Sequence, residues 1–154
     1  MKGIHWIIAA AAFVFVQPVQ AAQSDPEVII YRFPGVMDSG EPPFVGAATV
    51  FHCTNFSGAT ENIRFVTRNA GGTLTQNNAF PIPHLQTLTV ATHDTTAYAE
   101  FLLNTNAVAQ GTTAIAATSI NVICTAMTID AANPKPTGLA LRGIRFSPVP
   151  GSQE

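Results

Sequence analysis

Beyond residue 22, turn-forming residues cut the chain into short β-rich segments. Gly, Pro and Asn recur between these segments, and no sustained helical pattern longer than ten residues is present. Threonine is frequent in the segments, and its branched Cβ suits the pleated surface of a strand. About seven or eight short strands separated by turn signals predict an all-β fold, a single antiparallel β-sandwich.

The strand candidates differ in the clarity of their pattern. Residues 61–69 alternate most clearly, with Ile63 and Phe65 on one face. Residues 73–80 suit an edge strand or a loop, and the Pro- and Gly-rich residues 34–46 predict a loop. The other strand candidates are residues 28–31, 47–56, 85–92, 98–103, 113–119, 120–129 and 138–146, of which 113–119 and 120–129 also fit one long bent strand.

The first 21 residues have the parts of a secretory signal peptide. Lys2 supplies a positive start, residues 7–16 form an uninterrupted apolar run, and cleavage is expected after Ala21 or Ala22. The run is too short for a membrane-spanning helix, which needs about 20 apolar residues, and no second run follows. We therefore expect a secreted or periplasmic bacterial protein in which residues 22–154 form one domain without a stable membrane span. An uncleaved N-terminal anchor is the alternative.

The charge composition argues against a nucleic-acid partner. Charged residues make up 10% of the chain, and the formal net charge is −2. Proteins that bind nucleic acids carry a clustered basic surface, which this composition does not supply. A hydrophobic content of 47% also argues against intrinsic disorder.

Cys53 and Cys124 are the only cysteines, and both lie in apolar β-rich segments. In an exported chain an even pair of cysteines predicts a disulfide, here between two facing sheets. The placement of the pair on two internal strands is similar to the pattern of immunoglobulin-like domains. No Trp follows Cys53, and Val122 stands where those domains have a Tyr, so the analogy concerns architecture alone.

The histidines are the candidate metal ligands. His84 and His93 lie at the two ends of one strand candidate, about 30 Å apart if the strand is extended. They cannot share a metal ion in that case, although His52 could meet one of them across the sheet. The alternative interpretation is that all three are surface or partly buried side chains at strand ends, with no metal and no cofactor bound.

Signatures of catalysis are missing from the sequence. No G-x-S-x-G elbow, H-E-x-x-H motif, Walker A loop or G-x-G-x-x-G motif occurs. A Ser–His–Asp triad depends on geometry rather than sequence order. His93 and Asp94, with Ser57 or Ser119, supply the residue types for a small hydrolase, but no catalytic residue is predicted.

Several other side chains are candidates for surface contacts. Tyr31 and Phe44 are the aromatic residues best placed for exposed binding contacts. Asn55 begins a glycosylation sequon in form. Arg64 and Arg68 share one strand face, where arginine pairs hold carboxylates or phosphates or simply face acidic side chains across the sheet. Arg142 and Arg145 form a second such pair.

These observations predict an exported, non-enzymatic β-sandwich protein. Its expected role is a binding or structural module of the bacterial cell envelope or the extracellular space, with a protein partner whose identity the sequence does not indicate. Two alternatives remain open: a periplasmic metal-binding protein that uses its histidines, and a small secreted hydrolase.

Overall fold

The computed structural model describes residues 26–146, so the predicted signal peptide with its cleavage site and residues 147–154 lie outside the described residues. The described part contains ten strands and no helix. The strands are β1 (Val28–Asp38), β2 (Ala47–Asn55), β3 (Glu61–Arg68), β4 (Leu74–Ile82), β5 (Thr87–Ala91), β6 (Phe101–Leu102), β7 (Val108–Ala117), β8 (Val122–Asp130), β9 (Gly138–Leu141) and β10 (Ile144–Arg145).

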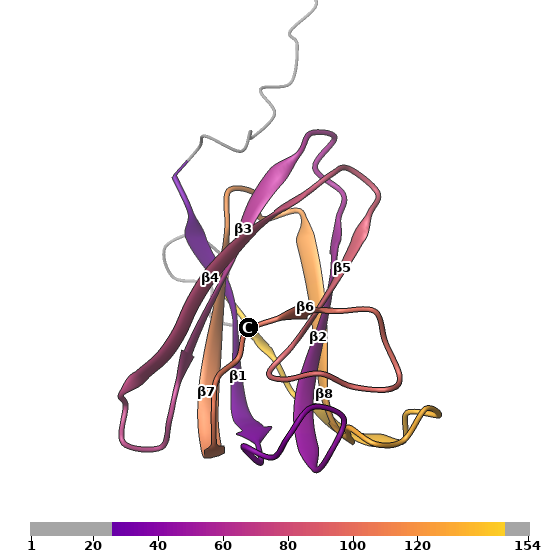
Figure 1. Ribbon diagram of the computed structural model, residues 1–154. Coiled ribbons are helices and arrows are strands. Elements are labelled where there is room, and N and C mark those ends of the chain that lie inside the picture. The colour runs from indigo at the N-terminus through magenta and orange to yellow at the C-terminus, as the bar shows by residue number, and fades with distance from the viewer. Residues whose placement is uncertain (1–25, 147–154) are drawn as a thin grey trace, which may run out of the picture.

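The strands form one mixed sheet that is curled into a half-barrel (Figure 1). One half has the order β4–β3–β7–β1, with β10 beside β1, and the other has the order β9–β8–β2–β5–β6. The halves are joined where Asp38 at the end of β1 pairs with Ala48 of β2. All pairs are antiparallel except β5 and β6. The all-β, mainly antiparallel prediction is therefore confirmed, but hydrogen bonding makes the two expected layers continuous.

The concave side of the half-barrel is filled by aromatic side chains from both halves. Phe33 of β1, Phe51 of β2 and Phe65 of β3 are essentially unexposed. The ring centroid of Phe51 lies 5.7 Å from that of Phe33 and 5.6 Å from that of Phe65. These contacts pack the two halves against each other, and tilted ring pairs at this separation are favourable. Phe65 lies on the face that the alternation of residues 61–69 predicted.

Side chains bridge the open side of the half-barrel between the edge strands β4 and β6. The ring centroids of Phe80 and Phe101 are 5.3 Å apart. The side-chain amide of Gln76 donates a hydrogen bond of 2.9 Å to the carbonyl oxygen of Asn104. β4 is an edge strand, one of the two alternatives left open for that segment, and this position tolerates Pro81, which has no N–H to donate.

β1 is longer than predicted because it runs through the Pro34–Gly35 pair to Asp38. The pairing of β1 with β7 shifts register on both sides of Val36, and Gly35 has a φ of 82°. β10 pairs only with Tyr31 and Arg32, so the other side of β1 is free at Pro34. An irregular, half-free strand accommodates proline and glycine where a regular central strand does not. The prediction of a loop over residues 34–46 was wrong for its first five residues.

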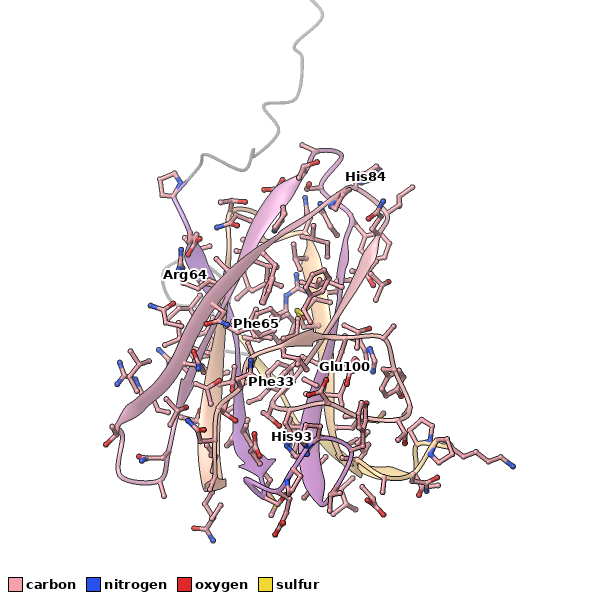
Figure 2. All side chains as sticks on the ribbon, viewed as in Figure 1. Phe33, Arg64, Phe65, His84, His93 and Glu100 are labelled. Atoms are coloured by element: carbon pink, nitrogen blue, oxygen red, sulfur yellow. A yellow bond between two sulfur atoms is a disulfide. The ribbon has the colours of Figure 1, made fainter. Side chains whose placement is uncertain are left out.

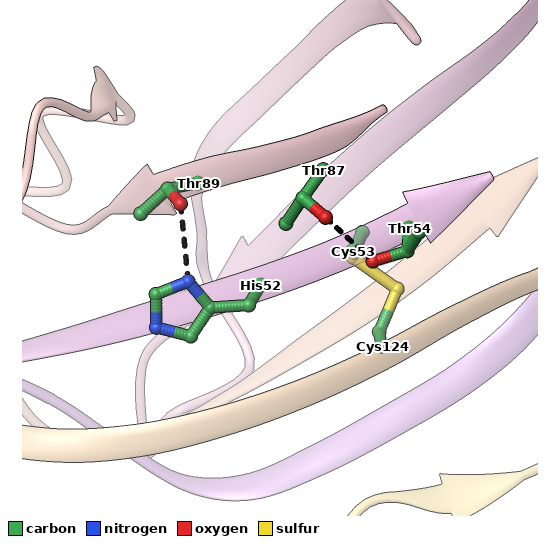
Figure 3. The surroundings of a disulfide bond; sticks show 6 residues. All are labelled: His52, Cys53, Thr54, Thr87, Thr89 and Cys124. Carbon is green, nitrogen blue, oxygen red and sulfur yellow. Dashed lines mark hydrogen bonds between the residues drawn. A yellow bond between two sulfur atoms is a disulfide. The ribbon is translucent and has the colours of Figure 1, made fainter. Parts of the chain in front are cut away.

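The disulfide joins neighbouring strands of one half of the sheet rather than two facing sheets (Figure 3). Cys53 of β2 and Cys124 of β8 stand directly opposite each other, with their Cα atoms 4.1 Å apart. Such close Cα atoms are typical of directly opposed residues that do not exchange backbone hydrogen bonds. The expected bridge between sheets was wrong because β2 and β8, far apart in sequence, pair along their full length.

Candidate binding pocket

The structure places the three candidate histidines in three separate surroundings. His84 lies beside the turn between β2 and β3, and its Nδ1 accepts a hydrogen bond from the backbone N–H of Gly58. His93 lies at the opposite end of the molecule, just after β5 (Figure 2). Among residues 26–146, no group of three or more His, Cys, Asp or Glu side chains is arranged to hold a metal ion.

His52 lies on the convex side of the sheet, in the middle of β2. Its Nδ1 is 3.0 Å from Oγ1 of Thr89 (Figure 3). Its ring packs edge-on against Tyr98, with the ring centroids 4.8 Å apart. Tyr98 belongs to the segment after β5, which covers a small apolar cluster around Val50 and Ile129. This covering segment partly buries His52, and the burial lowers the pKa of its imidazole below the usual 6.5.

His93 forms a buried hydrogen-bonded contact with Asp38. Asp38 ends β1 and His93 follows β5, so the corner of the half-barrel brings together two residues that are 55 positions apart. His93 Nδ1 lies 2.8 Å from Asp38 Oδ1 and Nε2 lies 3.1 Å from the carbonyl oxygen of Val45. Both partners are acceptors, so both contacts are hydrogen bonds when the ring carries a hydrogen on each nitrogen. These two contacts tie the residues after β5 to the end of β1 and to the β1–β2 loop.

The carboxylate of Asp38 is fully occupied by its neighbours. Oδ1 also accepts the backbone N–H of Gly40, and Oδ2 accepts the hydroxyl of Thr105 at 2.6 Å. Asp38, His93 and Thr105 are all less than 9% exposed. Burial of a charge is costly unless the group is paired and hydrogen-bonded, and this cluster meets both conditions.

A cavity of about 160 Å³ adjoins this cluster. Its walls come from the β1–β2 loop, from the residues after β5 and from the β6–β7 loop, and they are mainly polar. Among residues 26–146, the ion pairs are limited to Arg64 with Glu27 and His93 with Asp38. The carboxylates of Glu41 and Asp94 in the pocket wall therefore form no ion pair within the described chain. The lining residues are Asp38, Gly40, Glu41, Pro43, Thr92, His93, Asp94, Asn104 and Asn106.

Strained backbone is concentrated around this pocket. Four non-glycine residues in the described chain have positive φ: Phe44, Leu85, Asn104 and Asn106. Asn104 and Asn106 line the pocket, and Phe44 follows Pro43 in its wall and donates its N–H to the carbonyl oxygen of Asp94. Side chains in this region of φ usually cost free energy, and such residues gather at functional sites. The tertiary structure therefore holds the backbone of the pocket rim in a conformation that the intrinsic φ preferences of these residues disfavour.

The residue types for a hydrolytic triad are not assembled in the described structure. His93 pairs with Asp38 rather than Asp94. Ser57 follows β2 at the end remote from His93, about 25 Å away along the strand. Its hydroxyl bonds the carbonyl of Ala59, and that of Ser119 accepts the N–H of Asn121. His93 has no unoccupied ring nitrogen in this arrangement with which to act as a base.

Sequence reasoning missed Asp38 and Thr105 as members of the site. Asp38 lies inside the segment predicted as a loop, and Thr105 lies between two strands without a motif around it. The only local signal is the pair of asparagines flanking Thr105, because Asn adopts positive φ more readily than most residues. The partnership itself depends on the closure of the half-barrel corner.

The remaining surface candidates divide between buried and exposed positions. Tyr31 is buried, whereas Phe44 is 48% exposed beside the pocket. Asn55 is unexposed, and its side-chain amide donates to the carbonyl oxygens of Ala59 and Ile82, so its sequon is not accessible in the folded chain. Arg64 pairs with an acidic side chain, Glu27, which precedes β1 rather than lying on a neighbouring strand, and Arg145 lies over the ring of Tyr31.

No protein-family model, curated protein or solved structure matches this chain. In the part of the chain that the structure describes, no helix is long and apolar enough to cross a membrane.

Proposed function

We propose that the chain is an exported, non-enzymatic binding module of the bacterial cell envelope or the extracellular space, and that the pocket beside His93 is its ligand site. The observation that carries the proposal is the strained rim. Of the four described non-glycine residues with positive φ, Asn104 and Asn106 line this pocket, and Phe44 directly follows Pro43 of its wall. Backbone strain persists only where the surrounding structure enforces it. One physical reason for a protein to keep such strain is that it holds a binding site in its ligand-ready conformation.

The contacts made by both ring nitrogens of His93 support a binding role for the pocket rather than a catalytic one. Both ring nitrogens lie against acceptors, and no hydroxyl nucleophile of the described chain is hydrogen-bonded to the ring. General-base catalysis requires a ring nitrogen within hydrogen-bond reach of the proton that it removes. His93 acts instead as a tie that keeps the pocket wall in place.

Export is supported by the predicted signal peptide and by the buried disulfide. A bridge between Cys53 and Cys124 persists in the oxidising periplasm or outside the cell and is uncommon in the cytosol. In architecture, we treat the two halves of the sheet as the layers of an immunoglobulin-like sandwich, because Phe33 and Phe51 from opposite halves share one core. The hydrogen-bonded corner at Asp38 then places the pocket at one end of the sandwich.

The ligand of this pocket is expected to be small and rich in hydrogen-bond donors. Glu41 and Asp94 form no ion pair within the described chain and offer acceptor oxygens, and Asn104 and Asn106 also line the cavity. A cavity of 160 Å³ has room for a group about the size of benzene. An ammonium-bearing side chain of a partner protein fits this description, which keeps the site compatible with a role in assembly.

Native mass spectrometry of protein purified from the envelope of its own host tests the proposal. We expect extra mass that disappears on denaturation, is retained by the control variant Asp130→Asn and is lost from Asp94→Asn. The denatured chain should begin at Ala22 or Gln23 and weigh two hydrogens less than the reduced form. A chain that carries no additional mass, or an Asp94→Asn variant that retains it fully, would argue against the pocket as the ligand site. A bound metal ion lost on His93→Ala would favour the metal-binding alternative.

A further inference from the structure

A second cavity, of about 180 Å³, lies on the convex face of the other half of the sheet. Its floor is formed by β7, which contributes the short side chains of Thr112, Ala114 and Ala116. Its walls are longer side chains from the strands on either side of β7. We call this feature the β7 trough.

The strand register explains why the trough exists. Ala114 stands between Val66 of β3 and Arg32 of β1. Thr112 stands beside Arg68 of β3, one step further along the same face. Alternate residues of a strand project from the same face, so short side chains on the central strand lie between rows of long ones. Ala114 and Ala116 are each only 8% exposed although they face outward, which shows how closely the walls cover them.

The trough is basic at its rim and apolar at its base. Arg32 has no carboxylate partner in the described chain, and its guanidinium lies 5.6 Å from the centre of the Phe146 ring. Arg68 donates to the carbonyl oxygen of Gly72, which leaves its charge uncompensated by any described acid. Arg64, on the same strand face, differs because Glu27 neutralises it. Two arginines that have no ion-pair partner among residues 26–146 thus border one apolar cavity in a chain whose formal net charge is −2.

We propose that the β7 trough binds a small organic monocarboxylate whose apolar body is about the size of a benzene ring. An engineered cavity of about 150 Å³ accepts benzene, so the 180 Å³ trough accommodates a body of this size. A carboxylate matches the planar donor geometry of a guanidinium, and Arg32 and Arg68 flank the floor from opposite sides. The trough lies on a different face from the His93 pocket, so this inference does not depend on the ligand proposed there.

Titration of the purified mature protein with sodium benzoate, followed by NMR of ¹³C-methyl-labelled alanines, tests the proposal. The methyl groups of Ala114 and Ala116 report directly on the floor of the trough. We expect saturable shifts confined to these methyls, with a dissociation constant of about 10 mM or lower, as is usual for a ligand of this size. Benzamide keeps the apolar body without the charge, and acetate keeps the charge without the body. Each should bind at least about tenfold more weakly than benzoate.

Substitutions distinguish the contribution of the apolar floor of the trough from that of the two arginines at its rim. Ala114→Leu fills the trough and should abolish binding, whereas Arg68→Gln and Arg32→Gln should each weaken benzoate by about tenfold and leave benzamide unchanged. Arg142→Gln is the matched control, because it removes an exposed arginine outside the trough. Dispersed amide spectra show whether each variant is folded. If Ala114→Leu does not fold, the two arginine variants still test the proposal. Equal binding of benzoate, benzamide or acetate, the absence of saturation, or an equal effect of Arg142→Gln would overturn the proposal.

Discussion

Replacement of Asp38 by Asn is the sharpest test of how the pocket end of the molecule is held together. The substitution preserves the size of the side chain and one acceptor oxygen, but it removes the negative charge opposite His93. Gly40 and Thr105 retain hydrogen-bonding partners, because an amide both accepts and donates. The variant therefore isolates the contribution of the Asp38 carboxylate charge within an almost unchanged cluster.

The magnitude follows from the burial of the pair. The side chain of Asp38 is 2% exposed and that of His93 is 10% exposed. A hydrogen bond to a charged group contributes about 1.5–3 kcal/mol, and Asp38→Asn replaces the carboxylate acceptor opposite His93 by a neutral amide. His93 borders a water-accessible cavity, so we expect a value inside this range, about 2 kcal/mol. A protein of this size has a total stability of about 5–15 kcal/mol, and the variant should remain folded.

The assay is urea unfolding at pH 7 with the disulfide intact, applied to Asp38→Asn, His93→Gln and the double variant. The coupling energy between the two positions should be about 2 kcal/mol, within the range found for residues in direct contact. Glu41→Gln is the control, since it removes a carboxylate of the same pocket that has no cationic partner in the described chain, and it should cost less than about 0.5 kcal/mol. The reasoning fails if Asp38→Asn costs less than about 1 kcal/mol or if the two single effects simply add.

Three further predictions concern the core, the disulfide and pH. Phe65→Ala should destabilise the protein by about 3–5 kcal/mol in urea unfolding, since Phe65 is 0% exposed, whereas Phe101→Ala, at a 56% exposed position, should cost less than about 1 kcal/mol. Reduction of the Cys53–Cys124 bridge, which closes a loop of 71 residues, should lower the free energy of unfolding by about 4 kcal/mol, and an unchanged urea midpoint after reduction would contradict this. Burial lowers the folded pKa of His52 below 6.5, so the unfolded chain binds more protons as the pH falls through 6.5. Stability should therefore decrease as the pH falls from 6.5 toward the lowered folded pKa, and His52→Gln should flatten that part of a stability-against-pH curve.

The local pattern was sufficient to predict most strands. β2 and β3 follow directly from alternation, because Phe51, Ile63 and Phe65 occupy every second position and all are buried. Residues 113–129 were ambiguous between one strand and two, and the structure has two, β7 and β8, with a turn between them. The extension of β1 through Pro34 could not be predicted, since it depends on which side of β1 lacks a partner at that point.

The pairing of β2 with β8 was also beyond local analysis. No local sequence pattern identifies two strands as partners when 71 residues separate their cysteines. The same two cysteines are compatible with a bridge between two sheets or within one sheet. Placement of Cys124 directly opposite Cys53 is a property of register, which is set when the hydrophobic faces of the two strands align.

The sequence by itself determined the all-β class, the inward faces of the long strands and the residue types available for chemistry, because these depend on short-range alternation and turn preference. Tertiary structure alone decided which residues meet. Asp38 and His93 lie 55 positions apart, and only the closure of the half-barrel corner brings their charges together. The β7 trough likewise exists because β1 and β3 flank a strand of small residues, and strand order depends on long-range packing that no local pattern records.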